Sequence, residues 1–136
     1  MKEEVFWNSD IKDIKKGYID SGEHFECLLC GMNTEKGVIY KRENTLLDAE
    51  KEMKSHISET HVSVFDYLIN LNKKLTGISE QQKKLLKLFY QGKSDKEVQE
   101  ETETGSMSTI RNHRFMLKEK ERQAKVFLSV MELLRE

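Results

Sequence analysis

The order of apolar and polar residues predicts a mixed first half of the chain, in which helices alternate with short strands. Apolar residues at helical spacing in residues 9–19 ("SDIKDIKKGYI") predict a helix that is capped by Ser9 and reaches Tyr18. Residues 19–30 ("IDSGEHFECLLC") then read as an extended segment that turns at Ser21-Gly22. We therefore expect a helix followed by a β-hairpin at the start of the chain.

The pattern changes twice more before the middle of the chain. After the turn-prone residues 31–37 ("GMNTEKG"), residues 36–41 ("KGVIYK") predict one more short strand. Residues 46–60 ("LLDAEKEMKSHISET") place apolar side chains and His56 on one helical stripe. We expect this helix to end near His61.

The second half of the chain predicts helices only. Residues 63–74 repeat apolar side chains at helical spacing, so we expect a buried helical connector there. Ser79 can cap the next helix, which carries four large apolar residues and should end near Gly92.

Two more helix starts follow. Ser94 and Glu97 have the spacing of a capping box. In such a box the serine hydroxyl accepts the backbone N–H of the glutamate, and the glutamate carboxylate accepts the backbone N–H of the serine. After the break at residues 102–106 ("TETGS"), a last helix capped by Ser106 or Ser108 meets no Gly or Pro before the chain ends. The expected fold is mainly α with a small β-hairpin module, an α+β class with a long terminal helix.

Composition places the chain among small, densely charged globular proteins. Apolar residues make up 37% and charged residues 35% of its 136 residues, and there is no proline. The formal net charge is -1, but residues 1–62 hold 9 basic and 13 acidic residues, against 14 and 11 in residues 63–136. The second half is therefore positive, which favours a polyanion as its partner.

No segment predicts export or membrane insertion. The N-terminus breaks any apolar run with acidic residues, and no stretch reaches the roughly 20 apolar residues that a membrane helix needs. Cys27 and Cys30 are too few and too close together for a secreted disulfide framework. We therefore expect a cytoplasmic protein with no membrane partner.

Cys27 and Cys30 form a C-x2-C pair, and His56 and His61 follow on the predicted helix with four residues between them. A tight turn points two thiolates at one ion, and zinc prefers four such sulfur and nitrogen ligands in a tetrahedron. The four residues therefore predict a zinc site, near which the helix should loosen or end between the histidines. Since four protein ligands close the tetrahedron, we expect a structural rather than a catalytic ion.

Over about residues 23–62, this arrangement resembles the two-Cys, two-His zinc fingers. The gap from Cys30 to His56 holds 25 residues, about twice the usual dozen. The resemblance therefore implies zinc binding but not base reading by a tandem finger. Two alternatives stay open: the cysteines form a buried or redox-active pair, or His24 supplies one of the ligands.

Three short motifs in the second half match a DNA-binding pattern. Leu75-Thr76 precedes the first helix, residues 92–98 read "GKSDKEV" and residues 106–113 read "SMSTIRNH". They resemble the LuxR/GerE-type helix-turn-helix family, whose members run "LT-x-R-E", then "G-x-S-N-K-E-I-A", then "S-x-x-T-V-x-x-H". Sigma-factor DNA-binding regions share this outline. Gln99 and Thr102 depart from the family, which usually has a small Ala and a Leu at these positions.

The resemblance implies that the second helix of the pair enters the major groove of double-stranded DNA. Arg111 and Asn112 suit base edges, because these residue types pair with guanine and adenine. Thr109, Arg114 and Lys118 suit phosphates, as does the helix N-terminus near Ser94. The full set expected to contact DNA is Ser94, Lys96, Ser108, Thr109, Arg111, Asn112, Arg114 and Lys118. His113 is open to either a buried structural role or a contact at the boundary.

After Lys118, apolar residues continue the heptad phase of Ile110 and Leu117 through residues 121–136. This stripe must be covered by the N-terminal half, by the same helix of a second chain, or by a further domain of a longer product. We favour a homodimer, because helix-turn-helix proteins commonly dimerise and a two-fold axis places two recognition helices on two half-sites.

The leading hypothesis is a sequence-specific DNA-binding transcriptional regulator. It has a zinc module with an N-terminal helix over 1–62, the connector, a helix-turn-helix domain over 75–120 and a helical extension over 121–136. The competing hypothesis is a zinc-stabilised interaction module that acts on the transcription machinery, such as RNA polymerase. An enzyme is not expected, because no nucleophile and base pair, Gly-rich phosphate loop or open metal site is present.

Overall fold

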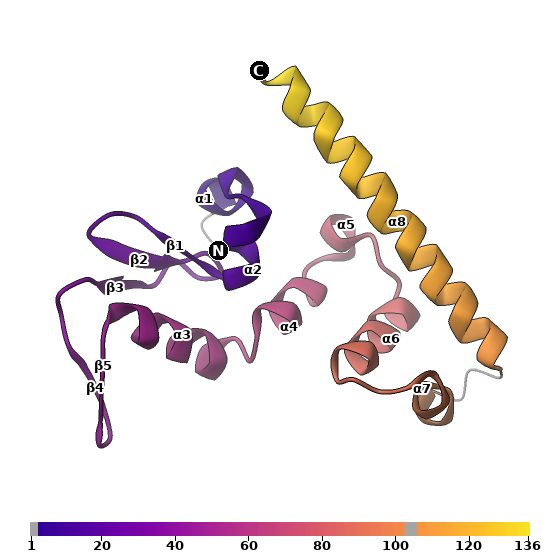
Figure 1. Ribbon diagram of the computed structural model, residues 1–136, viewed down its shortest axis with the longest axis horizontal. Coiled ribbons are helices and arrows are strands. Elements are labelled where there is room, and N and C mark those ends of the chain that lie inside the picture. Colours follow the sequence, from indigo (N-terminus) through magenta and orange to yellow (C-terminus); the bar gives the residue numbers. More distant parts are fainter. Residues whose placement is uncertain (1–2, 103–105) are drawn as a thin grey trace. The chain divides into compact units, whose positions relative to one another are not determined.

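The computed structural model describes residues 3–102 and 106–136 and contains two compact units, Met1–Gly77 and Ile78–Glu136 (Figure 1). The first unit combines short helices with two small antiparallel sheets, and the second contains helices only. This arrangement confirms the expected α+β class with a long C-terminal helix. In the described part of the chain, no helix is long and apolar enough to cross a membrane.

The first unit begins with two short helices, α1 (Glu3–Asn8) and α2 (Ile11–Lys16). The predicted cap at Ser9 is wrong: its hydroxyl donates to the carbonyl of Val5, 2.7 Å away, and so bonds back to the preceding helix. The helix also does not reach Tyr18. Gly17 ends it with φ +87°, and its N–H donates to the carbonyl oxygens of Asp13 and Ile14.

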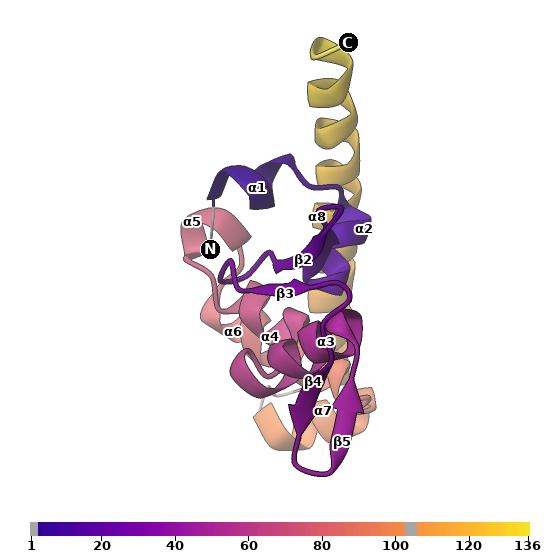
Figure 2. The same ribbon diagram turned by 90° about the vertical axis from the view of Figure 1, so that its left-hand side faces the viewer.

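Three strands form the main sheet, β1 (Tyr18–Asp20), β2 (His24–Cys27) and β3 (Asn33–Glu35), in the antiparallel order β1-β2-β3 (Figure 1). Figure 2 shows β2 and β3 beside each other. The hairpin between β1 and β2 confirms the predicted turn. Strand β3 corrects the expectation of a turn over residues 31–37. The side chain of Thr34 is fully buried, and its hydroxyl donates to the carbonyl of Ala49 at 2.8 Å, which fixes this segment against the next helix.

A second hairpin pairs β4 (Tyr40–Arg42) with β5 (Thr45–Leu47). The strand predicted over residues 36–41 therefore starts only at Tyr40. Gly37, with φ +85°, and a hydrogen bond from the Val38 N–H to the Glu35 carbonyl keep the preceding residues in a turn.

Helix α3 (Ala49–Thr60) lies against β2 and β3 and supplies the buried side chains that close the first core. Asp48 caps it by accepting the Lys51 N–H at 2.8 Å, so Leu46, which was expected on the helical stripe, belongs to β5. The buried residues of this first core are Phe6, Tyr18, Cys27, Leu28, Leu29, Met53 and Ile57.

The expected connector is two short helices, α4 (Val64–Ile69) and α5 (Lys73–Thr76), rather than one. Asn70 ends α4, and Asn72 starts α5 by accepting the Lys74 N–H at 2.8 Å. Val64, Tyr67 and Leu68 of α4 pack against the first core. This packing places α4 in the first unit.

The second unit consists of α6 (Glu80–Tyr90), α7 (Asp95–Thr102) and α8 (Met107–Leu134). Two helices start with a complete capping box. Ser79 and Gln82 form the box of α6, and Ser94 and Glu97 form the box of α7, which the sequence predicted. Ser106 caps α8 by accepting the Thr109 N–H. Of the predicted break at 102–106, residues 103–105 lie outside the described part.

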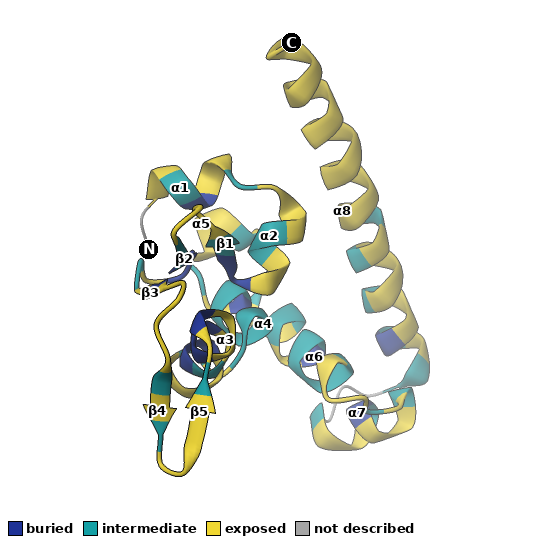
Figure 3. Ribbon diagram, turned by 60° about the vertical axis from the view of Figure 1, so that its left-hand side comes forward, coloured by how far each residue is buried: buried dark blue, intermediate teal, exposed yellow. Residues whose placement is uncertain are grey.

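The three helices share a small core. Leu85 of α6, Val98 of α7 and Ile110 of α8 are fully buried, and Leu88 and Phe89 pack against them. Beyond its first turns, α8 is mostly exposed (Figure 3). Its exposed large apolar residues are Phe115, Met116, Val126, Phe127, Leu128, Val130, Met131, Leu133 and Leu134. Ile110, in the first turn of α8, is thus the fully buried anchor of the unit's longest helix.

Gly17 is required for the packing of α4 on the first unit. A Cβ atom there would lie 2.7 Å from Val64 Cγ2 and 3.0 Å from Ile57 Cδ1, in addition to the cost of φ +87°. We expect Gly17→Ala to destabilise the unit by about 1–2 kcal/mol through the backbone and by about 1–3 kcal/mol more through overpacking. Urea unfolding followed by fluorescence measures this, because the single Trp of the chain, Trp7, lies in α1.

Gly37→Ala is the matched control. Gly37 has a similar φ of +85°, but nothing lies within 4 Å of an added Cβ. Gly37→Ala should lose only the backbone part of the unfolding free energy. Equal losses of unfolding free energy in the two variants would contradict the close packing of α4.

Candidate metal centre

Cys27 and Cys30 lie at the two ends of a tight turn that follows β2. The turn is closed by hydrogen bonds from the Gly31 N–H to the Cys27 carbonyl and from the Cys27 N–H to the Met32 carbonyl, each 2.8 Å long. Gly31 has φ +84°, which a residue with a side chain adopts only at a cost. The backbone N–H groups of Leu29 and Cys30 also donate to the Cys27 sulfur, so the turn holds this sulfur by polar contacts.

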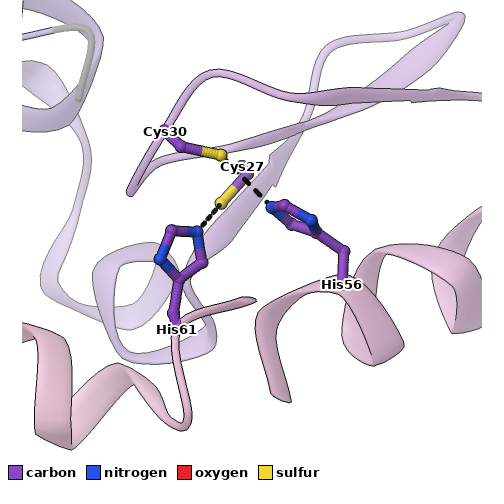
Figure 4. A group of neighbouring side chains, drawn as sticks. All are labelled: Cys27, Cys30, His56 and His61. Atoms are coloured by element: carbon purple, nitrogen blue, oxygen red, sulfur yellow. Dashed lines mark hydrogen bonds between the residues drawn. The ribbon is translucent and has the colours of Figure 1, made fainter. Parts of the chain in front are cut away.

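The two histidines come from the end of α3. His56 lies in its last turns, and His61 is the first residue after it, with φ -112° and ψ 0°. The helix therefore ends between the histidines, as their spacing predicts. This ending turns the His61 ring toward the cysteines instead of leaving it on another face of the helix (Figure 4).

All four side chains converge on one point between the turn and the helix (Figure 4). Cys30 Sγ lies 3.2 Å from His56 Nε2, Cys27 Sγ lies 3.7 Å from His61 Nε2, and the four donor atoms all lie within 4.8 Å of one another. Sulfur and nitrogen ligands of one tetrahedral ion are separated by about 3.5 Å, given bonds of roughly 2.3 and 2.0 Å. The cluster has the size and the donor atoms to hold a metal ion.

Burial shapes the protonation of the donors. It raises the pKa of the Cys27 thiol to about 11. Burial lowers the pKa of His56, with a further contribution from the Arg42 guanidinium, and burial together with His56 lowers the pKa of His61. Both imidazoles are therefore favoured in the neutral form that binds metals, whereas the buried thiol needs a cation beside it to lose its proton.

Neighbouring side chains orient the rings of both histidines. Thr60 Oγ1 lies 3.3 Å from His56 Nδ1, the ring nitrogen that faces away from the cysteines. A metal bound at Nε2 would leave the proton on Nδ1, which would then donate to this hydroxyl. The Tyr67 ring packs edge-on against His61, with 5.6 Å between ring centroids. Sequence patterns identified neither Thr60 nor Tyr67 as part of the site.

An ion-pair network lies beside the cluster. Arg42 Nε donates to both carboxylate oxygens of Glu52, at 2.9 and 2.8 Å, and its Nη1 donates to Glu59. The network joins the β4–β5 hairpin to α3, and Glu52 is buried. Glu59, the acid between the two histidines in sequence, is thereby engaged by a cation. No sequence signal links Arg42 to these glutamates, because they are 10 and 17 residues away.

His24 is not part of the cluster. It lies on β2 opposite Glu35, and among the described residues the only candidate metal group is that of Cys27, Cys30, His56 and His61. The alternative in which His24 supplies a ligand is therefore not supported by the geometry.

The residues expected to contact DNA lie in the second unit. Ser94 and Lys96 are exposed at the start of α7, and Ser108, Arg111, Asn112 and Lys118 are exposed along the first half of α8. Thr109 is half-buried, and its hydroxyl lies 3.1 Å from that of Ser106. The structure thus brings the predicted set together on the α7 and α8 helices of one unit.

Arg114 has contacts within the unit that the sequence did not predict. Its guanidinium donates to Asp95 Oδ1 at 2.9 and 2.7 Å and stacks over the Phe89 ring, 3.8 Å from the centroid. Arg114 therefore links α8 to both α6 and α7. His113 is half-buried, and its Nδ1 is buried without a partner among the described residues.

Comparison with protein-family models, with curated proteins and with solved structures finds no match to this chain. The functional interpretation therefore depends on the residues and their geometry.

We expect the purified protein to contain a single metal ion per chain and Cys27→Ser to lose it, because serine offers no soft thiolate to complete the donor set. Elemental analysis after gel filtration measures this directly. His24→Ala is the matched control and should keep the ion, since His24 lies outside the cluster. A parent protein free of metal when purified with added zinc would contradict the site.

Proposed function

We propose that this protein is a sequence-specific DNA-binding transcriptional regulator whose N-terminal unit is held together by a structural zinc ion. One observation carries the proposal: a Cys2His2 donor cluster in the first unit accompanies a three-helix second unit whose last helix starts with exposed polar and basic residues.

Zinc is the ion that this donor set favours. Two thiolates with two imidazoles suit a tetrahedral ion of intermediate softness, and they exclude the hard, oxygen-seeking Mg²⁺ and Ca²⁺. Four protein ligands fill the tetrahedron, so the ion would be structural. It would join the turn after β2 to the end of α3, in a unit with a small apolar core.

DNA recognition by α8 is supported by the division of its faces. Ile110 is fully buried against Leu85 and Val98, while Arg111 and Asn112, the next residues along the helix, are exposed. A recognition helix needs this combination, because one side packs on its own domain while the other reads base edges. The resemblance to the LuxR/GerE-type helix-turn-helix supports the same assignment.

Phosphate contacts would fix the protein on the duplex. Ser94 and Lys96 lie at the N-terminal end of α7, where the helix dipole favours anions. Lys118 is exposed on α8 and pairs with Glu121 at 3.3 Å, a surface ion pair that a phosphate could replace. Arg114 would contact a phosphate while it keeps its ion pair with Asp95.

The second candidate function is a zinc-stabilised module that binds an acidic surface of the transcription machinery. The overall charge of -1 favours it, because a DNA-binding protein usually carries a net positive charge. A steep fall of duplex affinity with salt, together with preference for particular sequences, would favour the regulator.

We expect Arg111→Ala and Asn112→Ala each to weaken binding to the preferred duplex by about 1–3 kcal/mol and to relax sequence preference at one position. The duplex is selected from a random pool with the parent protein, and equilibrium binding is measured at matched salt. Lys125→Ala is the control, because it removes a charge from the same helix beyond residues 75–120. Unchanged binding in both test variants would refute base recognition by α8.

We also propose that the exposed apolar face of α8 pairs with the same face of a second chain. Substitution of both Phe127 and Met131 by Asp should then convert a dimer into a monomer, because two charges would have to be buried in the interface. Analytical ultracentrifugation checks this, with Lys125→Ala again as the control. A parent protein that sediments as a monomer at high concentration would rule out the dimer.

A further inference from the structure

The corner between α3 and α4 contains a strained residue. Val62, which follows the candidate ligand His61, has φ +68°, a value that a β-branched residue adopts only at a cost. The Ser63 N–H donates to the His61 carbonyl at 2.7 Å and closes a three-residue turn around Val62. A turn of this kind with positive φ at its centre is the rare, strained form of the γ-turn.

The side chain of Val62 does not offset this strain. It is 71% exposed and is not part of the first core, so its burial contributes little. Glu43, the other described non-glycine residue with positive φ, lies at the tip of the β4–β5 hairpin, where such values are common. The restraint on Val62 must come from the residues on either side of it.

Both neighbours of Val62 are held. On one side, His61 Nε2 faces Cys27 Sγ at 3.7 Å, within the donor cluster. On the other side, Ser63 caps α4 by accepting the Asp66 N–H at 2.9 Å, and Val64 packs closely over Gly17. In α4, Ile69 is buried, and Val64, Tyr67 and Leu68, which pack against the core, are half-buried.

We propose that Val62 is a positioning residue that sets the affinity of the metal centre: the strained corner forms when the ion holds His61 and relaxes when the ion leaves. This inference rests on the metal binding proposed above. Part of the binding free energy of the ion is spent on the strain at Val62, so the site binds its ion less tightly than its four ligands allow. Loss of the ion frees His61 and with it the start of α4.

Replacing Val62 by Asn tests the proposal, because Asn adopts positive φ at a smaller cost than a β-branched residue. We expect Val62→Asn to bind zinc about tenfold more tightly in competition with a chromophoric chelator, which corresponds to about 1.4 kcal/mol. Val62→Ile keeps a β-branched side chain and should match the parent affinity. Val38→Asn makes the same exchange at another exposed valine of this unit, one without positive φ, and should also match the parent.

Amide hydrogen exchange provides a readout that is independent of affinity. In the parent, the Ser63 and Asp66 amides donate within the corner and should be protected when zinc is bound and exchange faster after chelation. In Val62→Asn the exchange rates of these amides with zinc bound and after chelation should differ less, because the corner then persists without the ion.

Three results would overturn the proposal. If the parent binds zinc but Val62→Asn has the same affinity, the inference fails while the proposed metal site stands. If Val62→Asn stabilises the metal-free and the zinc-loaded protein equally, the corner does not depend on the ion. If the parent binds no zinc, both the inference and the metal site fail.

Discussion

The N-terminal unit brings four metal-binding atoms to one point. Two are sulfur atoms on a turn and two are imidazole nitrogens at the end of a helix, and much of the unit positions them. The β1-β2-β3 sheet presents the turn, and α3 lies across β2 and β3 with its last residues beside it. Gly31 allows the turn, and the end of α3 at Thr60 releases His61 toward Cys27. Without an ion, these four donors would have only weak hydrogen bonds to one another, so the cluster makes physical sense chiefly as a ligand set.

The four residues of the donor cluster could be predicted from the sequence as two pairs, because the spacing within each pair is local. A C-x2-C pair is typical of a tight turn, and the x4 gap between the histidines predicts that the helix loosens or ends between them. The capping box of Ser94 and Glu97 was predictable for the same reason, since a helix start depends on four consecutive residues.

Other features depend on contacts between distant residues and carry no local signal. Strand β3 forms at turn-prone residues because Thr34 bonds to Ala49, which lies 15 positions away. Arg42 reaches the site because the β4–β5 hairpin folds toward α3, and only the tertiary structure shows that Glu59 is engaged. Propensity describes each segment alone, and here tertiary packing decided the outcome.

The second unit concentrates its stability in few contacts. Three fully buried side chains form its core, and the Arg114 guanidinium adds an ion pair to α7 and a stacking contact to α6. A helix of 28 residues extends from this small base. The exposed half of α8 therefore gains stability from its own backbone hydrogen bonds and from ion pairs such as that of Arg122 with Glu119.

The β4–β5 hairpin lies, in sequence, between the cysteine pair and the histidine pair, yet it provides none of the four donors. Arg42, next to the tip, and Tyr40, whose hydroxyl accepts the Glu35 N–H, attach the hairpin to the unit, and its turn residues are exposed. The length of the segment between the two halves of the donor set can thus vary at the tip while the donors keep their places. The hairpin is accordingly a natural point at which to insert a peptide tag or a fluorescent label into the protein.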